Sequence, residues 1–297
     1  MKAKTANLLC LLVAMIWGGG FIATDLVLET FSPFAMLVCR FVGAAVLAWI
    51  PVLIKKEKPE KSEIIKGSLS GVLLYAAFAF QTFGMDLTEP GMNAFLTSVN
   101  VVIVPVLAYV FLKKKPDRII LVACMVCLAG IGCLSLSSGK FEFRFGDFLS
   151  LMCAVFFAAQ IVSLEYAKGC RVSVINAIQL SAAGICSLPF GLMTDWPSSV
   201  NGITILGLLY SIVLSTFVCY LLQTAAQQHT SAAAASILLG TECLWANLFS
   251  VLILHQPESP VMIFGGLLIF ASILLVEGQG ILFRKRRKEI LSAEETL

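Results

Sequence analysis

The chain has 297 residues, of which 59% are hydrophobic and only 13% are charged. Soluble domains usually contain about 25% charged residues. The hydrophobic residues here lie in runs long enough to cross the hydrocarbon core of a bilayer, so the composition indicates an integral membrane protein. The net charge of +3 comes from basic residues in short runs between apolar segments, which argues against a nucleic-acid partner.

Hydropathy predicts ten membrane-spanning helices. The expected spans are 6–28, 33–54, 64–86, 90–112, 117–137, 146–168, 173–194, 202–226, 230–254 and 259–282. Most connections are short and carry turn residues, as in Glu89-Pro90 and Lys115-Pro116-Asp117. A membrane β-barrel would need short segments of alternating polarity instead. The predicted fold is an all-α membrane protein.

The distribution of basic residues predicts the orientation of the chain. If the amino terminus is cytoplasmic, every Lys and Arg except Arg40, Lys140 and Arg144 lies on the inner side. Cytoplasmic loops retain Lys and Arg, so we expect both termini on the cytoplasmic side of the cell membrane. The basic run at 284–288 then forms a cytoplasmic tail that contacts anionic membrane lipid. The oligomeric state stays open.

Ten cysteines raise the question of a metal or redox site. All but Cys170 fall inside apolar segments, where a thiol behaves as a small hydrophobic group. Cys124 and Cys127 form a C-x-x-C pair, but no second pair or histidine cluster accompanies it. We therefore expect no metal site and no cofactor.

The chain resembles itself at a nearly constant shift of 141 residues. Ser32 corresponds to Ser173 and Gly43 to Gly184, whereas Gln81-Thr82 matches Gln223-Thr224 at a shift of 142. The two predicted repeats cover 1–142 and 143–297. Each holds five spans, an odd number, so the second repeat must be inverted relative to the first. Inverted repeats are typical of alternating-access carriers with a binding site near the middle of the membrane.

Short motifs in a fixed order resemble the EamA-type drug/metabolite transporters, which have ten helices. The motifs are Trp17-Gly18 with Phe21, Pro33 with Arg40-Phe41, Phe95-Leu96-Thr97-Ser98 with Pro105, Gly146-Asp147, and Glu242. The resemblance extends over nearly the whole chain. It implies a carrier, usually an exporter of metabolites or amphipathic compounds, with a cavity enclosed by spans 1, 3, 4, 6, 8 and 9.

Polar and aromatic residues form stripes on several spans, at spacings that place them on one helix face. Such groups should face the protein interior, because lipid offers no hydrogen-bond partners. The candidate substrate-binding residues are Trp17, Tyr75, Asn93, Thr97, Asn100, Gln160, Tyr220, Gln223 and Trp245. The alternative role is hydrogen bonding between helices, worth about 0.6 kcal/mol per contact.

Two charged residues lie well inside predicted spans, away from the helix ends. Glu242 is near the centre of the ninth span, where an ionised carboxylate is costly unless it is paired. Our hypothesis is that Glu242 couples transport to protons or contacts substrate; the alternative is a structural acid or a partner of Arg40. Arg40 is expected to be a structural anchor or to form an ion pair.

An enzyme, a structural protein and a flippase are the alternatives to a transporter of small solutes. An enzyme would need a nucleophile, base or metal ligands, and the chain carries neither an H-E-x-x-H motif nor a P-loop. A structural protein would have no reason to contain an inverted repeat. The sequence thus predicts a secondary transporter of a small organic solute, with a flippase for lipid or lipid-linked sugar as the alternative.

Overall fold

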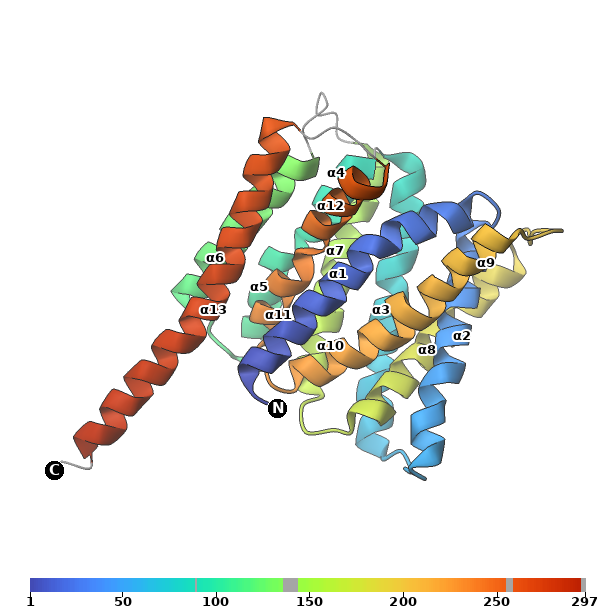
Figure 1. Ribbon diagram of the computed structural model, residues 1–297. Helices are drawn as coiled ribbons and strands as arrows, with labels where there is room; N and C mark the ends of the chain where they lie inside the picture. The colour runs from blue at the N-terminus through green and yellow to red at the C-terminus, as the bar shows by residue number, and fades with distance from the viewer. Residues whose placement is uncertain (89, 136–143, 255–258, 295–297) are drawn as a thin grey trace.

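The computed structural model describes residues 1–88, 90–135, 144–254 and 259–294, whose regular structure is entirely helical (Figure 1). The first half contains α1 (Ala3–Leu28), α2 (Pro33–Ile54), α3 (Lys61–Leu87), α4 (Pro90–Ser98), α5 (Asn100–Leu112) and α6 (Arg118–Ser135). The second half contains α7 (Phe145–Tyr166), α8 (Val172–Leu192), α9 (Gly202–Leu209), η1 (Tyr210–Val218), α10 (Cys219–Gln227), α11 (Ala232–Gly240), α12 (Glu242–Leu254) and α13 (Pro260–Glu294).

These helices make up ten crossings, because three of the rods are interrupted. Eight rods are long and apolar enough to span a membrane, and two shorter apolar helices cover Arg118–Leu134 and Pro260–Val276. The rod pairs α4–α5 and α11–α12 each form one crossing, as do α9, η1 and α10 together. The predicted all-α fold of ten membrane helices in two five-helix repeats is confirmed, and the protein is a multi-pass membrane protein.

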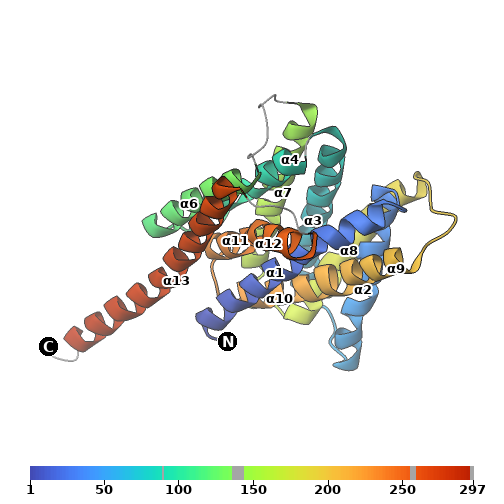
Figure 2. The ribbon, with the colours of Figure 1, turned by 45° about the horizontal axis from the view of Figure 1, so that its top comes forward.

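The two halves pack in a two-fold pattern. The α2 helix packs on α8, and α6 packs on α13. The contact of α1 with α9–α10 has its counterpart in the contact of α7 with α3. Figures 1 and 2 show α6 and α13 side by side at one edge of the bundle. A Cβ at Gly130 would lie 2.7 Å from the carbonyl oxygen of Gly265, so the α6–α13 crossing requires glycine there.

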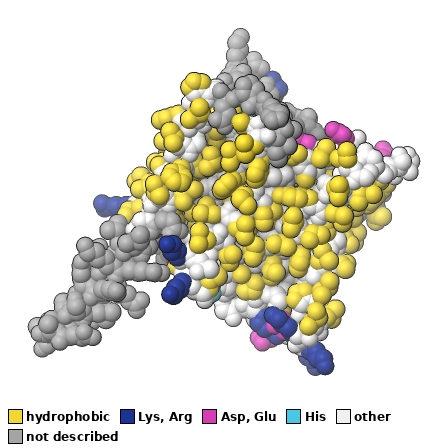
Figure 3. Space-filling view, in the orientation of Figure 1, with side chains coloured by type: hydrophobic (Ala, Val, Ile, Leu, Met, Phe, Trp, Pro, Cys, Tyr) yellow, Lys and Arg dark blue, Asp and Glu magenta, His cyan; other side chains and the backbone are white. Residues whose placement is uncertain are grey.

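The lateral surface is apolar, as a lipid-facing surface must be. Figure 3 shows hydrophobic side chains over this face, with most charged groups toward its two ends. Large apolar residues such as Leu53 and Phe111 are exposed, whereas Gln160, Gln179 and Gln223 are buried. Polar side chains therefore gather inside the bundle, between helices from both halves.

The fourth and ninth crossings are interrupted at corresponding places. The α4 and α5 helices meet at Val99, and α11 and α12 meet at Thr241, 142 residues later. Ser98 donates to the carbonyl oxygen of Ala94 (2.8 Å), and Thr241 donates to that of Leu238 (2.7 Å). Such side-chain bonds to the preceding turn bend helices. Discontinuous helices of this kind line the binding sites of many transporters.

Two further departures from regular spans follow from local chemistry. Within the eighth crossing, η1 is a nine-residue π-helix. The α13 helix continues to Glu294, past the predicted end at 282, because Lys, Arg and Glu are good helix formers. Lys140 and the Pro257-Glu258 pair lie outside the described residues.

Candidate functional site

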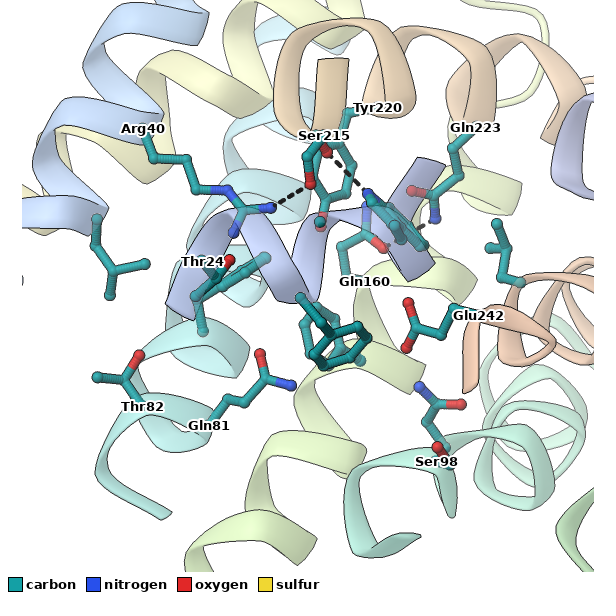
Figure 4. A pocket seen from close by; sticks show the side chains of 18 of the residues that line it. Thr24, Arg40, Gln81, Thr82, Ser98, Gln160, Ser215, Tyr220, Gln223 and Glu242 are labelled. Atoms are coloured by element: carbon teal, nitrogen blue, oxygen red, sulfur yellow. Dashed lines mark hydrogen bonds between the residues drawn. The ribbon is translucent and has the colours of Figure 1, made fainter. Parts of the chain in front are cut away.

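A cavity of about 280 Å³ lies between the two halves of the bundle (Figure 4). Residues of α1, α2, α3, α7, η1 and α10 line it, together with residues of the α4–α5 and α11–α12 rods. The cavity is at the small end of the range for ligand pockets. Its lining includes α2, in addition to the six crossings that the family resemblance implies.

The cavity extends toward one end of the bundle. The α1 residues that line it run from Trp17 to Leu28, and those of α2 run from Pro33 to Arg40. The α1–α2 turn lies between these stretches, so the cavity reaches from mid-bundle toward the end that carries this turn. We call this the open end. No residue of α1 before Trp17 takes part in the lining.

Arg40 is held at the cavity wall by the π-helix. Its Nε donates to Thr216 Oγ1 (2.6 Å), and its Nη2 donates to Ser215 Oγ (3.0 Å). The guanidinium also lies 4.5 Å from the ring centre of Phe78. Ser215 and Thr216 are consecutive residues, and the hydroxyl groups of both accept hydrogen bonds from the same guanidinium group. No carboxylate of the described residues lies within ion-pair distance of Arg40.

The π-helix is held in place from within and from α1. Thr216 Oγ1 donates to the carbonyl oxygen of Ser211 (2.7 Å), five residues earlier. The indole nitrogen of Trp17 donates to the carbonyl oxygen of Ser215 (2.8 Å). The rings of Trp17 and Tyr220 are 5.5 Å apart. Both aromatic residues line the cavity and form an apolar wall beside the guanidinium.

Glu242 is the first residue of α12, directly after the helix interruption. Its side chain lines the cavity and points into it in Figure 4. Within the described part of the chain, its carboxylate accepts no hydrogen bond and forms no ion pair. The cavity therefore contains a fixed cation, Arg40, and an acid, Glu242, that do not pair with each other.

Amide side chains form a network at the inner boundary of the cavity. Gln223 Nε2 donates to Gln160 Oε1 (3.3 Å) and to Gln227 Oε1 (3.1 Å). Gln160 Nε2 donates in turn to Gln179 Oε1 (3.4 Å). Gln223 Oε1 is buried without a partner among the described residues. Since Gln223 lines the cavity, this unsatisfied acceptor lies at the cavity boundary.

The structure brings together most of the residues that the sequence singled out. Those that line the cavity are Trp17, Arg40, Asn100, Gln160, Tyr220, Gln223 and Glu242. Four others lie away from it. Tyr75 packs in the apolar cluster between α2, α3 and α8. Asn93 donates to Ser150 Oγ (2.8 Å), and Thr97 donates to the carbonyl oxygen of Ala94 (3.1 Å). Trp245 packs against Gly18 of α1.

Several lining residues were not among the sequence candidates. They are Ser98, Ser215, Ser236, Gln81 and Asp25. Small hydroxyl residues are common in membrane helices, so nothing in the sequence distinguished Ser215 from other serines. In the described residues, no group of three His, Cys, Asp or Glu side chains could hold a metal ion.

A family model for EamA-like transporters matches the chain twice, over residues 4–136 and 144–278. The chain belongs to the EamA-like transporter family. An uncharacterized transporter of Archaeoglobus fulgidus is 32% identical to this EamA-like chain over 277 residues, covering 93% of it and 87% of the relative. Protein PagO of Salmonella typhimurium is 22% identical and covers 80% of this chain and 81% of its own length. A crystal structure of another protein has a TM-score of 0.78 at 14% identity and covers 93% of this chain and 96% of its own chain, which shows the fold.

Substituting two buried amides should separate a cavity role from a packing role. Gln223→Ala removes a group that lines the cavity, so we expect transport to fall by more than membrane abundance does. Asn93→Ala removes the bond to Ser150 away from the cavity, which should destabilise the fold by about 1–3 kcal/mol and lower abundance. Transport and abundance are measured for both variants in the same cells. Equal loss of the two quantities in Gln223→Ala would assign Gln223 to packing.

Proposed function

We propose that this EamA-like protein is a secondary transporter that binds a compact organic solute in the central cavity and exposes it to each side of the membrane in turn. The observation that carries the proposal is the cavity itself, which lies between the two halves and contains unpaired charges of both signs. Charged groups inside a membrane protein usually mark a substrate or ion pathway.

The placement of charge supports a particular class of solute. Arg40 can bind a carboxylate or another small anion through the donors it does not use for Ser215 and Thr216. Glu242 and Gln223 Oε1 are acceptors and suit an ammonium group or another donor. The proposed substrate therefore carries an anionic group and a cationic or donor group on a compact, partly apolar body. The alternative from the sequence is a lipid or lipid-linked sugar, and a lipid or sugar without an amino group would place no cationic group beside Glu242.

Glu242 also supports a mechanism of coupling. Its carboxylate can bind either a proton or the cationic group of the solute, so the two ligands compete for one site. In a cell membrane whose proton gradient points inward, this competition exchanges entering protons for leaving solute. We infer that the protein is an exporter driven by the proton gradient.

Removing the charge of Glu242 tests this coupling. Glu242→Gln keeps the size of the side chain but cannot release a proton. Transport by this variant, measured in proteoliposomes, should lose its dependence on pH and on an imposed proton gradient. Glu29→Gln is the matched control, because Glu29 is an exposed acid at the end of α1. A Glu242→Gln protein with the wild-type rate and pH dependence would remove Glu242 from the mechanism.

The proposed substrate class can be tested with purified protein and a matched set of compounds. Leucine carries both charges, its N-acetyl derivative only the negative one, and its methyl ester only the positive one. A ligand at 100 times its dissociation constant stabilises the folded state by about 2.7 kcal/mol. We expect leucine, or another amino acid of similar size, to raise the melting temperature more than either derivative. Stronger stabilisation by a singly charged derivative would contradict the proposed class.

The proposed orientation places the protein in the cell membrane with both termini on the cytoplasmic side. Glu60 and Ser198 are exposed residues of the α2–α3 and α8–α9 connections. Single cysteines at these positions should react differently with a membrane-impermeant thiol reagent added to intact cells. Position 198 should be labelled and position 60 protected until the cells are opened. The opposite pattern would reverse the orientation.

A further inference from the structure

A buried carboxylate lies beyond the cavity, at the end of the bundle opposite the open end. The side chain of Glu165 is only 3% exposed. Its oxygens accept from Lys114 Nζ (2.8 Å), Lys168 Nζ (3.2 Å) and the backbone nitrogen of Ala232 (2.6 Å). One acid therefore joins the end of α7, the segment after α5, the α7–α8 connection and the start of α11.

The position of Glu165 relates it to the cavity. The last α7 residue in the cavity lining is Ile161, and Glu165 follows one helical turn later. Between the two levels, Gln227 Nε2 donates to the carbonyl oxygen of Ile161 (2.8 Å). The amide network and the Glu165 contacts thus form two successive polar layers. We call this end of the bundle the closed end.

Only one of the three donors to Glu165 comes from the first half of the chain. Lys114 follows α5, whereas Lys168 and Ala232 belong to the same half as Glu165. Lys168 is also fixed within that half, because its Nζ donates to the carbonyl oxygen of Thr230 (2.7 Å). The Lys114–Glu165 ion pair is therefore the charged contact of this cluster that crosses between the halves. A neutral hydrogen bond also crosses there, from Thr230 Oγ1 to Asn7 Oδ1 (2.9 Å).

The two partners of this ion pair differ in exposure. The Lys114 side chain is 58% exposed, whereas Glu165 is almost fully buried. If Lys114 moves away, water can solvate its ammonium group. Glu165 keeps Lys168 and the Ala232 nitrogen, so no unpartnered buried charge results. Leaving a buried charge without any partner would be strongly destabilising. This arrangement allows the bridge to open at moderate cost.

A second ion pair between the halves lacks this freedom. Arg171 donates through Nε (3.0 Å) and its backbone nitrogen (3.0 Å) to Glu63 Oε1, and through Nη2 (2.5 Å) to Glu63 Oε2. It lies on the seam between α3 and α8, where a Cβ at Gly67 would approach Ile178 to 2.8 Å. The close packing of these two helices makes the Glu63–Arg171 pair a fixed contact.

We propose that the Lys114–Glu165 ion pair is a latch that holds the closed end shut and must break for that end to open. The latch rests on the proposed alternating-access function. Of the described residues, the one 141 positions before Glu165 is the uncharged Thr24, so Glu165 has no acidic counterpart at the open end. The resting protein is therefore biased toward the state that is closed at the Lys114 end. Glu165 acts here as a positioning residue and does not touch the solute.

Hydrogen–deuterium exchange of the purified full-length protein tests the latch. Lys114→Met removes the bridging charge and keeps the apolar stem. We expect faster exchange in peptides covering 228–236, by about fivefold for the loss of an ion pair whose lysine is exposed. Exchange should slow in peptides covering 21–32 at the open end, because that end closes when the other opens. Lys115→Met is the matched control and should leave both regions at the wild-type rate.

A second variant keeps the test independent of folding defects. Glu165→Gln weakens the bond from Lys114 together with those from Lys168 and Ala232, so it should change exchange in the same directions. Adding Lys114→Met to it should change the exchange by less than Lys114→Met does in the wild-type protein, since the shared interaction is already weakened. Unchanged exchange in Lys114→Met, or faster exchange at both ends, would overturn the latch. Exchange is measured without solute, so failure to transport the proposed class leaves this result intact. A failed latch likewise leaves the proposed transport function standing.

Discussion

The structure depends on one constraint: inside hydrocarbon, polar groups must find partners within the protein. The amide network meets it by joining α7, α8 and α10 through Gln160, Gln179 and Gln223. Ser70 extends the network to α3 of the first half by donating to Gln179 Oε1 (3.0 Å). Most buried polar groups are satisfied in this way. The groups left unsatisfied at the cavity, Glu242 and Gln223 Oε1, therefore mark where a ligand can bind.

The same constraint explains how far the sequence could predict the fold. Long apolar runs allow only helices or closed barrels in a membrane, so the number and type of the crossings followed from the distribution of apolar residues along the chain. The odd number of crossings per repeat then required inversion of the second copy. Interruptions at Val99 and Thr241 did not follow, because short polar side chains that bond to the preceding turn look the same in sequence as those that face a neighbouring helix.

The sequence could predict which polar side chains face the protein interior, and only part of these line the cavity. Trp17, Tyr220 and Glu242 line the cavity, but Asn93 and Trp245 lie elsewhere on equally inward-facing surfaces. Helical periodicity shows that a residue faces the interior, but it cannot distinguish a cavity from a neighbouring helix. Trp245 illustrates this limit, since the absence of a side chain at Gly18 lets α1 approach it closely.

Charge is arranged differently at the two levels of the bundle. At the cavity, Arg40 is held by neutral hydroxyls, so its charge is not neutralised by a neighbouring acid. At the closed end, Glu165 has three donors and its charge is balanced locally. Coulomb interactions are stronger away from bulk water. The charges of Arg40 and Glu242 can therefore interact with a solute. The Glu165 cluster instead joins segments of the protein.

The π-helix also accounts for an irregularity in the internal repeat. The offset between the halves is 141 residues at Ser32/Ser173 and Gly43/Gly184, but 142 at Gln81/Gln223. The interval from Gly184 to Gln223 is thus one residue longer than the interval from Gly43 to Gln81, and it contains η1. In a regular α-helix, one inserted residue would rotate everything after it by about 100°. A π-helix has more residues per turn and can accommodate an extra residue without this rotation, and within η1 both Ser215 and Thr216 bond to Arg40. A length difference of one residue would in this way be enough to give two similar halves different chemistry at the cavity wall.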